Sequence, residues 1–185
     1  MDRELRKVGA SPELEAECWA FALAVYARPG VSEACLTLQN EAGVDVMLLL
    51  TTTFAAVKHR VLLTPDEIRA LDEACRLWRE QIVRPLRNIR TELKTGPQPA
   101  PSEATEQFRS QVKALELAAE KLENQLLVEC LPLRPPEKET VRAEQLRAVL
   151  EDVVSLFAGR AGSAPKASLP ASIDTIVEAA IQNAS

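Results

Sequence analysis

Apolar side chains recur every three to four positions along most of this chain, which is the spacing of one face of an α-helix. The repeat is clearest between residues 65 and 94. Its members are Ile68, Leu71, Cys75, Trp78, Ile82, Leu86, Ile89 and Leu93. We expect one long helix there, bent near Gln81, because Pro85 removes a backbone hydrogen bond inside the pattern.

Cap residues predict where further helices start. Ser11, Ser32, Asp45, Thr64 and Ser102 each precede a stretch with helical spacing. The predicted helices cover about 12–27, 33–40, 46–59, 65–94, 103–130 and 137–158. The β-branched run Thr51–Thr53 leaves a buried strand open as an alternative for 44–57.

The helix after Ser102 has an apolar seam with alternating spacings of four and three, as in a coiled coil. The seam residues are Phe108, Val112, Leu115, Ala119, Leu122 and Leu126. They span less than three heptads, so we expect the seam to pack on its own domain.

These elements predict an all-α protein with one orthogonal or bundle-like domain of about six helices over residues 11–158. Residues 159–171 are rich in small residues and proline and are expected to form a flexible linker. Residues 172–183 predict a short amphipathic helix that is too short to be stable alone. It must dock, either on its own domain or on a partner protein, and the pattern leaves both open.

Composition narrows the function classes. The chain has 185 residues, 46% of them apolar, and a net charge of −5, which argues against a whole-protein grip on nucleic acid. Its four cysteines lack metal-site spacing, and no signal peptide is apparent, so we expect a reducing cytoplasm. The most apolar segment, 44–57, is too short to span a bilayer. The oligomeric state is not predicted.

Basic residues gather on one face of the predicted helix over 65–94. The candidates for binding an anion or an acidic partner are Arg76, Arg79, Arg84, Arg87, Arg90 and Lys94. Guanidinium groups suit phosphate and carboxylate ligands. The alternative is a solvated face with pairs such as Asp72 with Arg76 and Glu80 with Arg84.

No residue pattern predicts catalysis, a metal site or a cofactor. The single histidine, His59, lies between two basic residues and excludes multi-histidine metal sites. There is no glycine-rich phosphate loop and no nucleophile elbow. Neighbouring acids are explained as first-turn or solvated residues.

Several blocks of the chain form a recognisable motif. The most specific block is WAFALAVYARPGVSEACLTLQ at 19–39, followed by GVDVMLLL at 43–50. Trp78-Arg79, Pro85-Leu86-Arg87 and KALELAAE at 113–120 follow downstream. Together these blocks resemble an uncharacterised proteobacterial family known as a domain of unknown function. The resemblance covers about 12–131 and implies an all-α cytoplasmic bacterial protein, but no reaction.

The function expected from these patterns is that of a protein-interaction or adaptor module, because the chain offers an arginine face and a docking tail but no reactive group. The alternative is an enzyme or binding protein for a small anionic ligand, phosphorylated or lipid-derived, with Trp19, Tyr26 and Trp78 as pocket candidates beside the arginines. Non-specific nucleic-acid contact is a third alternative.

Overall fold

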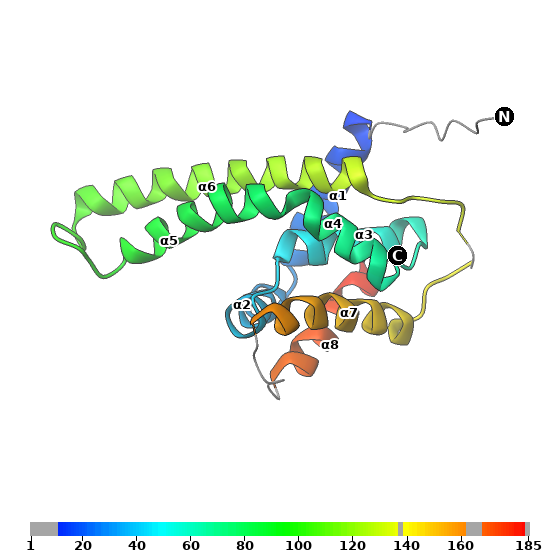
Figure 1. Ribbon diagram of the computed structural model, residues 1–185. Helices are drawn as coiled ribbons and strands as arrows, with labels where there is room; N and C mark the ends of the chain where they lie inside the picture. The colour runs from blue at the N-terminus through cyan, green and yellow to red at the C-terminus, as the bar shows by residue number, and fades with distance from the viewer. Residues whose placement is uncertain (1–10, 137–138, 162–167, 184–185) are drawn as a thin grey trace.

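The computed structural model describes residues 11–136, 139–161 and 168–183, and these residues form helices and no strand. The predicted all-α fold is confirmed. The helices are α1 (Pro12–Tyr26), α2 (Val31–Ala42), α3 (Val46–His59), α4 (Pro65–Trp78), the π-helical turn η1 (Arg79–Val83), α5 (Arg84–Glu92), α6 (Glu103–Cys130), α7 (Ala143–Ala161) and α8 (Ser168–Gln182). Figure 1 shows α5 and the first half of α6 projecting from a body made by the other helices.

Most predicted helix starts are confirmed by the cap geometry. Asp45 Oδ1 accepts hydrogen bonds from the Met47 and Leu48 amides at 2.8 and 3.2 Å. Thr64 forms the expected capping box with Glu67. The prediction for Ser32 was wrong, because α2 starts at Val31 and Gly30 is its cap at φ +79°, a conformation that glycine adopts without a steric penalty.

Residues 46–59 form helix α3, so the alternative of a strand there is wrong. The helix passes through the middle of the body, with ten consecutive buried residues from Met47 to Ala56. Buried hydroxyl groups usually have hydrogen-bond partners. Thr53 donates to the Leu49 carbonyl at 2.8 Å, and the Cys18 thiol donates to the Thr51 hydroxyl at 3.8 Å. Among the described residues, no group pairs with the buried Thr52 hydroxyl.

The long helix predicted for 65–94 runs from Pro65 to Glu92 and is interrupted by the π turn η1. The π turn ends just before Pro85. The Arg84 amide donates a hydrogen bond to the Arg79 carbonyl, five residues back, and Pro85 is the next residue. A wider turn accommodates the proline ring and the missing amide hydrogen.

Helix α6 runs antiparallel to α4, η1 and α5, and its outer half forms with α5 the projecting hairpin that we call the arm (Figure 1). The inner half of α6 packs on α1, α3 and α4. The predicted cap Ser102 accepts a hydrogen bond from the Thr105 amide at 3.3 Å.

The C-terminal segments close the body. Helix α7 starts at Ala143 and extends to Ala161, while α8 starts at Ser168, so the linker predicted over 159–171 is shorter than expected, and 162–167 lie outside the described residues. Pro170 is tolerated because it lies in the first turn of α8. Helix α8 packs against α2 and α7 in the same chain, burying Ile173, Ile176 and Val177. Among the described helices, none is long and apolar enough to cross a membrane.

Candidate functional site

Arg79 lies at the centre of a group of charged side chains and is almost fully buried. Its side chain is 4% exposed and donates to Asp45 and to Asp72, with N–O distances of 2.6 Å in both pairs. Burial alone would lower the pKa of Arg79, but Asp45 and Asp72 outweigh it and hold the pKa above its usual value. Arg160 of α7 adds a second cation, paired with Asp72.

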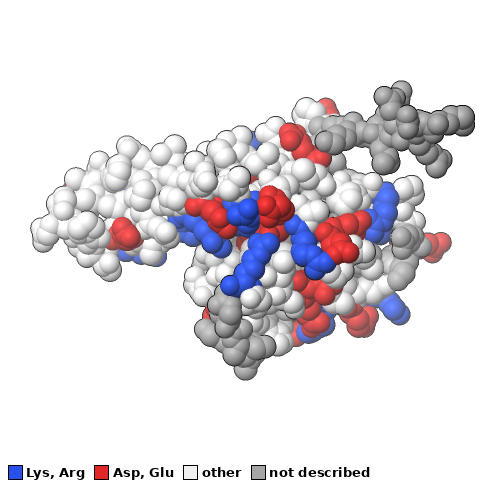
Figure 2. Space-filling view, viewed as in Figure 1, with Lys and Arg blue, Asp and Glu red and all other residues white. Residues whose placement is uncertain are grey.

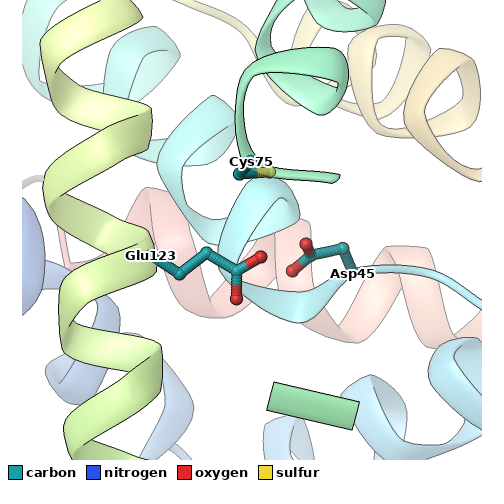
Figure 3. A group of neighbouring side chains, drawn as sticks. All are labelled: Asp45, Cys75 and Glu123. Carbon is teal, nitrogen blue, oxygen red and sulfur yellow. The ribbon is translucent and has the colours of Figure 1, made fainter. Parts of the chain in front are cut away.

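Glu123 reaches this group from α6. Figure 3 shows its carboxyl group facing that of Asp45, with the Cys75 sulfur beside them. Burial raises the pKa of Glu123 to about 10, helped by the charge of Asp45 and a hydrogen bond between the two groups. Glu123 is therefore protonated at pH 7, and its carboxyl O–H donates a hydrogen bond that the Asp45 carboxylate accepts.

The neutral Glu123 balances the charges of the buried group. Two aspartates, Asp45 and Asp72, face two arginines, Arg79 and Arg160, so the charges sum to zero when Glu123 keeps its proton. Arg160 is 44% exposed and reaches Asp72 from the surface, whereas Arg79 and both aspartates are buried and are stabilised by their pairing. We call these five side chains the buried ion cluster.

The cluster also offers a donor set for a metal ion. Ligand atoms of Asp45, Cys75 and Glu123 lie within 4.8 Å of one another, and Glu123 Oε1 has no hydrogen-bond partner. Binding would require the loss of two protons, whereas burial raises the pKa of both Cys75 and Glu123. Arg79 already provides the positive charge beside Asp45. The arrangement favours a structural ion network over a metal centre at neutral pH.

A second set of ion pairs lies where the arm joins the body. Arg87 contacts Glu116 and Glu120 at 2.9 and 2.7 Å, and Arg90 also pairs with Glu116. Burial alone would raise the pKa of Glu116, but hydrogen bonds from the two arginines lower it below its usual value. Burial raises the pKa of Glu120, against the effect of Arg87. Both arginines thus already have carboxylate partners.

The other candidate cations differ from the expected solvated face. Arg76 pairs with Glu73 and Glu80 rather than with Asp72, which turns inward to Arg79. The suggested pair of Glu80 with Arg84 is not formed. Within the described parts of the chain, no carboxylate pairs with Arg84 or Lys94. Figure 2 accordingly shows Lys and Arg side by side with Asp and Glu on this face, and no continuous basic surface.

A cleft of about 420 Å³ lies between α1, α2, α3, α5 and α6, and two of the predicted pocket residues line it, Trp19 and Tyr26. Apolar side chains form most of its wall: Trp19, Leu23, Tyr26, Leu36, Met47, Leu50 and Leu117. Trp78, the third pocket candidate, lies elsewhere and donates its indole N–H to the Ala119 carbonyl at 3.0 Å. We call this space the apolar cleft.

A neighbouring polar cleft of about 320 Å³ lies above the buried ion cluster. Its lining includes the donors Arg79, Arg84, Arg87, Asn88, Gln39 and Asn40, together with the carboxyl groups of Asp45 and Glu123. The two clefts share Gln39, Met47 and Arg87. Together they join an apolar space to one that is rich in hydrogen-bond donors.

Sequence reasoning named the arginines and both aromatic residues of these clefts but missed the carboxylates opposite them. Asp45 was recognised only as a helix cap, and Glu116 and Glu123 were not singled out. One signal was present: both glutamates lie four residues from an apolar seam position of α6, Val112 and Ala119, and therefore close to its buried side.

One comparison with known proteins finds a match, and the match includes the residues that line the two clefts. No curated protein and no solved structure matches the chain. A family model described as "Protein of unknown function (DUF2390)" matches residues 17–127. The match includes Asp45, Arg79, Glu123 and both clefts, while α7 and α8 lie beyond it. Because it covers more than half of the chain, the protein belongs to the DUF2390 family.

Proposed function

We propose that this protein binds a small amphipathic anion, with its apolar part in the apolar cleft and its head group at Arg84 and Arg87. The observation that carries the proposal is the junction of the two clefts at Gln39, Met47 and Arg87. An apolar wall with a few convergent polar groups is typical of small-molecule sites, and the volumes fall in the usual range.

The charges support an anionic head group. Arg84 is exposed and has no carboxylate partner among the described residues, so its guanidinium is available to a ligand. Arg87 is paired with Glu116 and Glu120, so a ligand anion would share its guanidinium with these two carboxylates. A phosphate or carboxylate can accept bidentate hydrogen bonds from such groups.

Tyr26 adds a neutral donor near the same end of the apolar cleft. Burial raises the pKa of its phenol, which therefore stays protonated at neutral pH. The remaining wall offers aliphatic and aromatic contacts and suits an unbranched alkyl chain or a similar tail.

The test uses decyl phosphate below its micelle-forming concentration, measured by isothermal titration calorimetry. We expect binding that inorganic phosphate and decanol, each alone, do not match. Arg84→Gln should weaken binding about tenfold, the effect of one lost charge-assisted hydrogen bond. Lys94→Gln is the matched control, since Lys94 is exposed and lies at the far end of the arm. Absence of binding, or an equal effect of both variants, would contradict the proposal.

A protein-interaction role is the second candidate. The arginine face and the C-terminal helix, which suggested this role from the sequence, do not support it in the structure. Four of the six candidate cations pair with carboxylates of the same chain, and α8 docks on the body of its own chain. A different surface favours such a role, namely the outer face of the arm.

A further inference from the structure

A row of large apolar side chains is exposed along the outer face of the arm and continues onto the adjoining turns of η1 and α6. Ile89, Phe108 and Leu115 lie on the arm, with exposed fractions of 44, 52 and 59%. Ile82 of η1 and Leu122, which lines a groove beside α1, continue the row with exposed fractions of 38 and 49%. Single exposed leucines are ordinary in proteins. These five, however, are spaced seven residues apart on each helix, which is the interval at which a helix returns the same face to a neighbouring helix.

The five side chains lie on one face of the helix pair because the opposite face is occupied. Arg87 and Arg90 reach Glu116 across the inner face, next to the apolar cleft. On a helix with 100° per residue, Leu115 is turned by 100° from Glu116, and Ile89 by 160° from Arg87. Both apolar residues therefore point away from the ion pairs.

The same face carries little charge. The residues of α6 that flank the row are uncharged: Ala104, Gln107, Gln111, Ala114, Ala118 and Gln125. On α5 the exposed acid Glu92 lies one turn from Ile89. Figure 2 shows the projecting arm as a mostly uncharged part of the surface, in contrast to the body. In a chain of net charge −5, two copies meet here with less repulsion than elsewhere on the surface.

We infer that the outer face of the arm binds the outer face of a second copy of this chain, and that the two hairpins form a four-helix bundle. Residues 104–126 of α6 extend about 35 Å, whereas residues 82–92 beside them extend about 16 Å. Helices about 10 Å wide then present a face of roughly 500 Å². A stable interface buries about 800 Å² on each partner, so we expect a weak dimer. Side chains spaced seven residues apart can insert between the matching side chains of the second copy, as they do in a two-fold helical bundle.

Sedimentation velocity over a dilution series of the full chain tests this inference. We expect a reversible monomer–dimer equilibrium. Leu115→Lys places a charge in the centre of the interface and should raise the dissociation constant roughly thirtyfold or more. Ile89→Lys should act in the same direction from the other helix.

Leu77→Lys is the matched control, because Leu77 has the same exposed fraction of 59% but lies on α4, outside the row. Circular dichroism of each variant at low concentration checks that the fold is retained. A wild-type protein that stays monomeric at every concentration overturns the inference. So does a dimer that survives Leu115→Lys and Ile89→Lys, or one that Leu77→Lys disrupts equally.

Discussion

The two halves of the α4–α6 helix pair have opposite surfaces. The inner half buries charge: Asp72, Arg79 and Glu123 are no more than 4% exposed. The outer half, the arm, exposes apolar side chains, of which Leu115 is 59% exposed. A soluble helix pair usually shows the reverse arrangement, with apolar residues inside and charges outside.

The difference arises from what covers each half. The inner half lies against α3 and α7, and the cation Arg79 packs 5.3 Å from the ring centre of Phe157 while its charge is matched by two aspartates. The arm extends beyond the body, so within the described chain no helix covers its outer face (Figure 1). Buried charge is stable only with its partners, and exposed apolar surface indicates a site of contact.

The largest expected effect comes from removing the central cation. Arg79→Met leaves Asp45 and Asp72 buried without their shared partner and should lower the free energy of unfolding by about 3–5 kcal/mol, measured by urea denaturation. Arg84→Met, on the exposed side of the same helix, should change it by less than about 0.5 kcal/mol. Similar effects of the two substitutions would mean that the buried ion cluster has no special role in stability.

Glu123→Gln should stabilise the protein. The wild-type folded state holds the Glu123 proton up to pH 10 or so, whereas the unfolded chain releases it near pH 4.5, so stability falls as the pH rises between these values. Glutamine keeps the shape and a donor for Asp45 but does not titrate. The free energy of unfolding of the variant should equal that of the wild type below pH 4.5 and exceed it by about 3 kcal/mol at pH 7.

Urea denaturation at several pH values measures this gain, and Glu129→Gln, at an exposed position of the same helix, is the control. A loss of stability at pH 7 in the Glu123 variant would show that the group is ionised in the folded state.

Glu116→Gln should lower the free energy of unfolding, by a smaller amount than Glu123→Gln raises it. The pKa of Glu116 is lowered in the folded state, so its contribution to stability is present above pH 4.5, near its unfolded value, and is lost as the pH falls through the folded value. At pH 7 the variant should lose about 1–3 kcal/mol, because two arginines lose a charged acceptor. The loss should shrink in acid. A constant loss between pH 3 and pH 7 or so would indicate a packing effect alone.

The smallest effect is expected on the outer face of the arm. Leu115→Gln should change the stability of the dilute monomer by less than about 0.5 kcal/mol, since nothing in the same chain covers this side chain. Leu127→Ala, at a fully buried position on the same helix, should cost about 2–5 kcal/mol. A large effect of Leu115→Gln at low concentration would show that the arm contacts its own body in solution.

Local sequence rules predicted most of the fold. The capping box at Thr64, the cap at Asp45 and the C-cap glycine Gly43 all act as their residue types suggest. The errors share one cause, which is that tertiary contacts decided between local alternatives. At the tight α1–α2 turn, Gly30 and not Ser32 is the N-cap of α2. Helix α8 begins at Ser168 because its first turn docks on the body, where the Ser168 hydroxyl donates a hydrogen bond to Glu41.

The candidate site could be predicted only in part. Periodicity identifies which residues share a face of one helix, so the arginines of α5 and the aromatic residues of α1 could be named in advance. It does not say which polar face another helix covers. Arg79 and Arg84 have the same side chain and lie five residues apart, yet one is 4% exposed and the other is at the surface.

The amino-acid sequence by itself determined the helices, their caps and the apolar stripes, because these depend on contacts within a few residues along the chain. The tertiary structure decided which charges are buried together and which apolar side chains remain uncovered, because both depend on the crossing of α6 with helices distant in sequence. The seam predicted on α6 shows the division: Val112 and Ala119 are buried, whereas Leu115 and Leu122, on the same stripe, stay exposed.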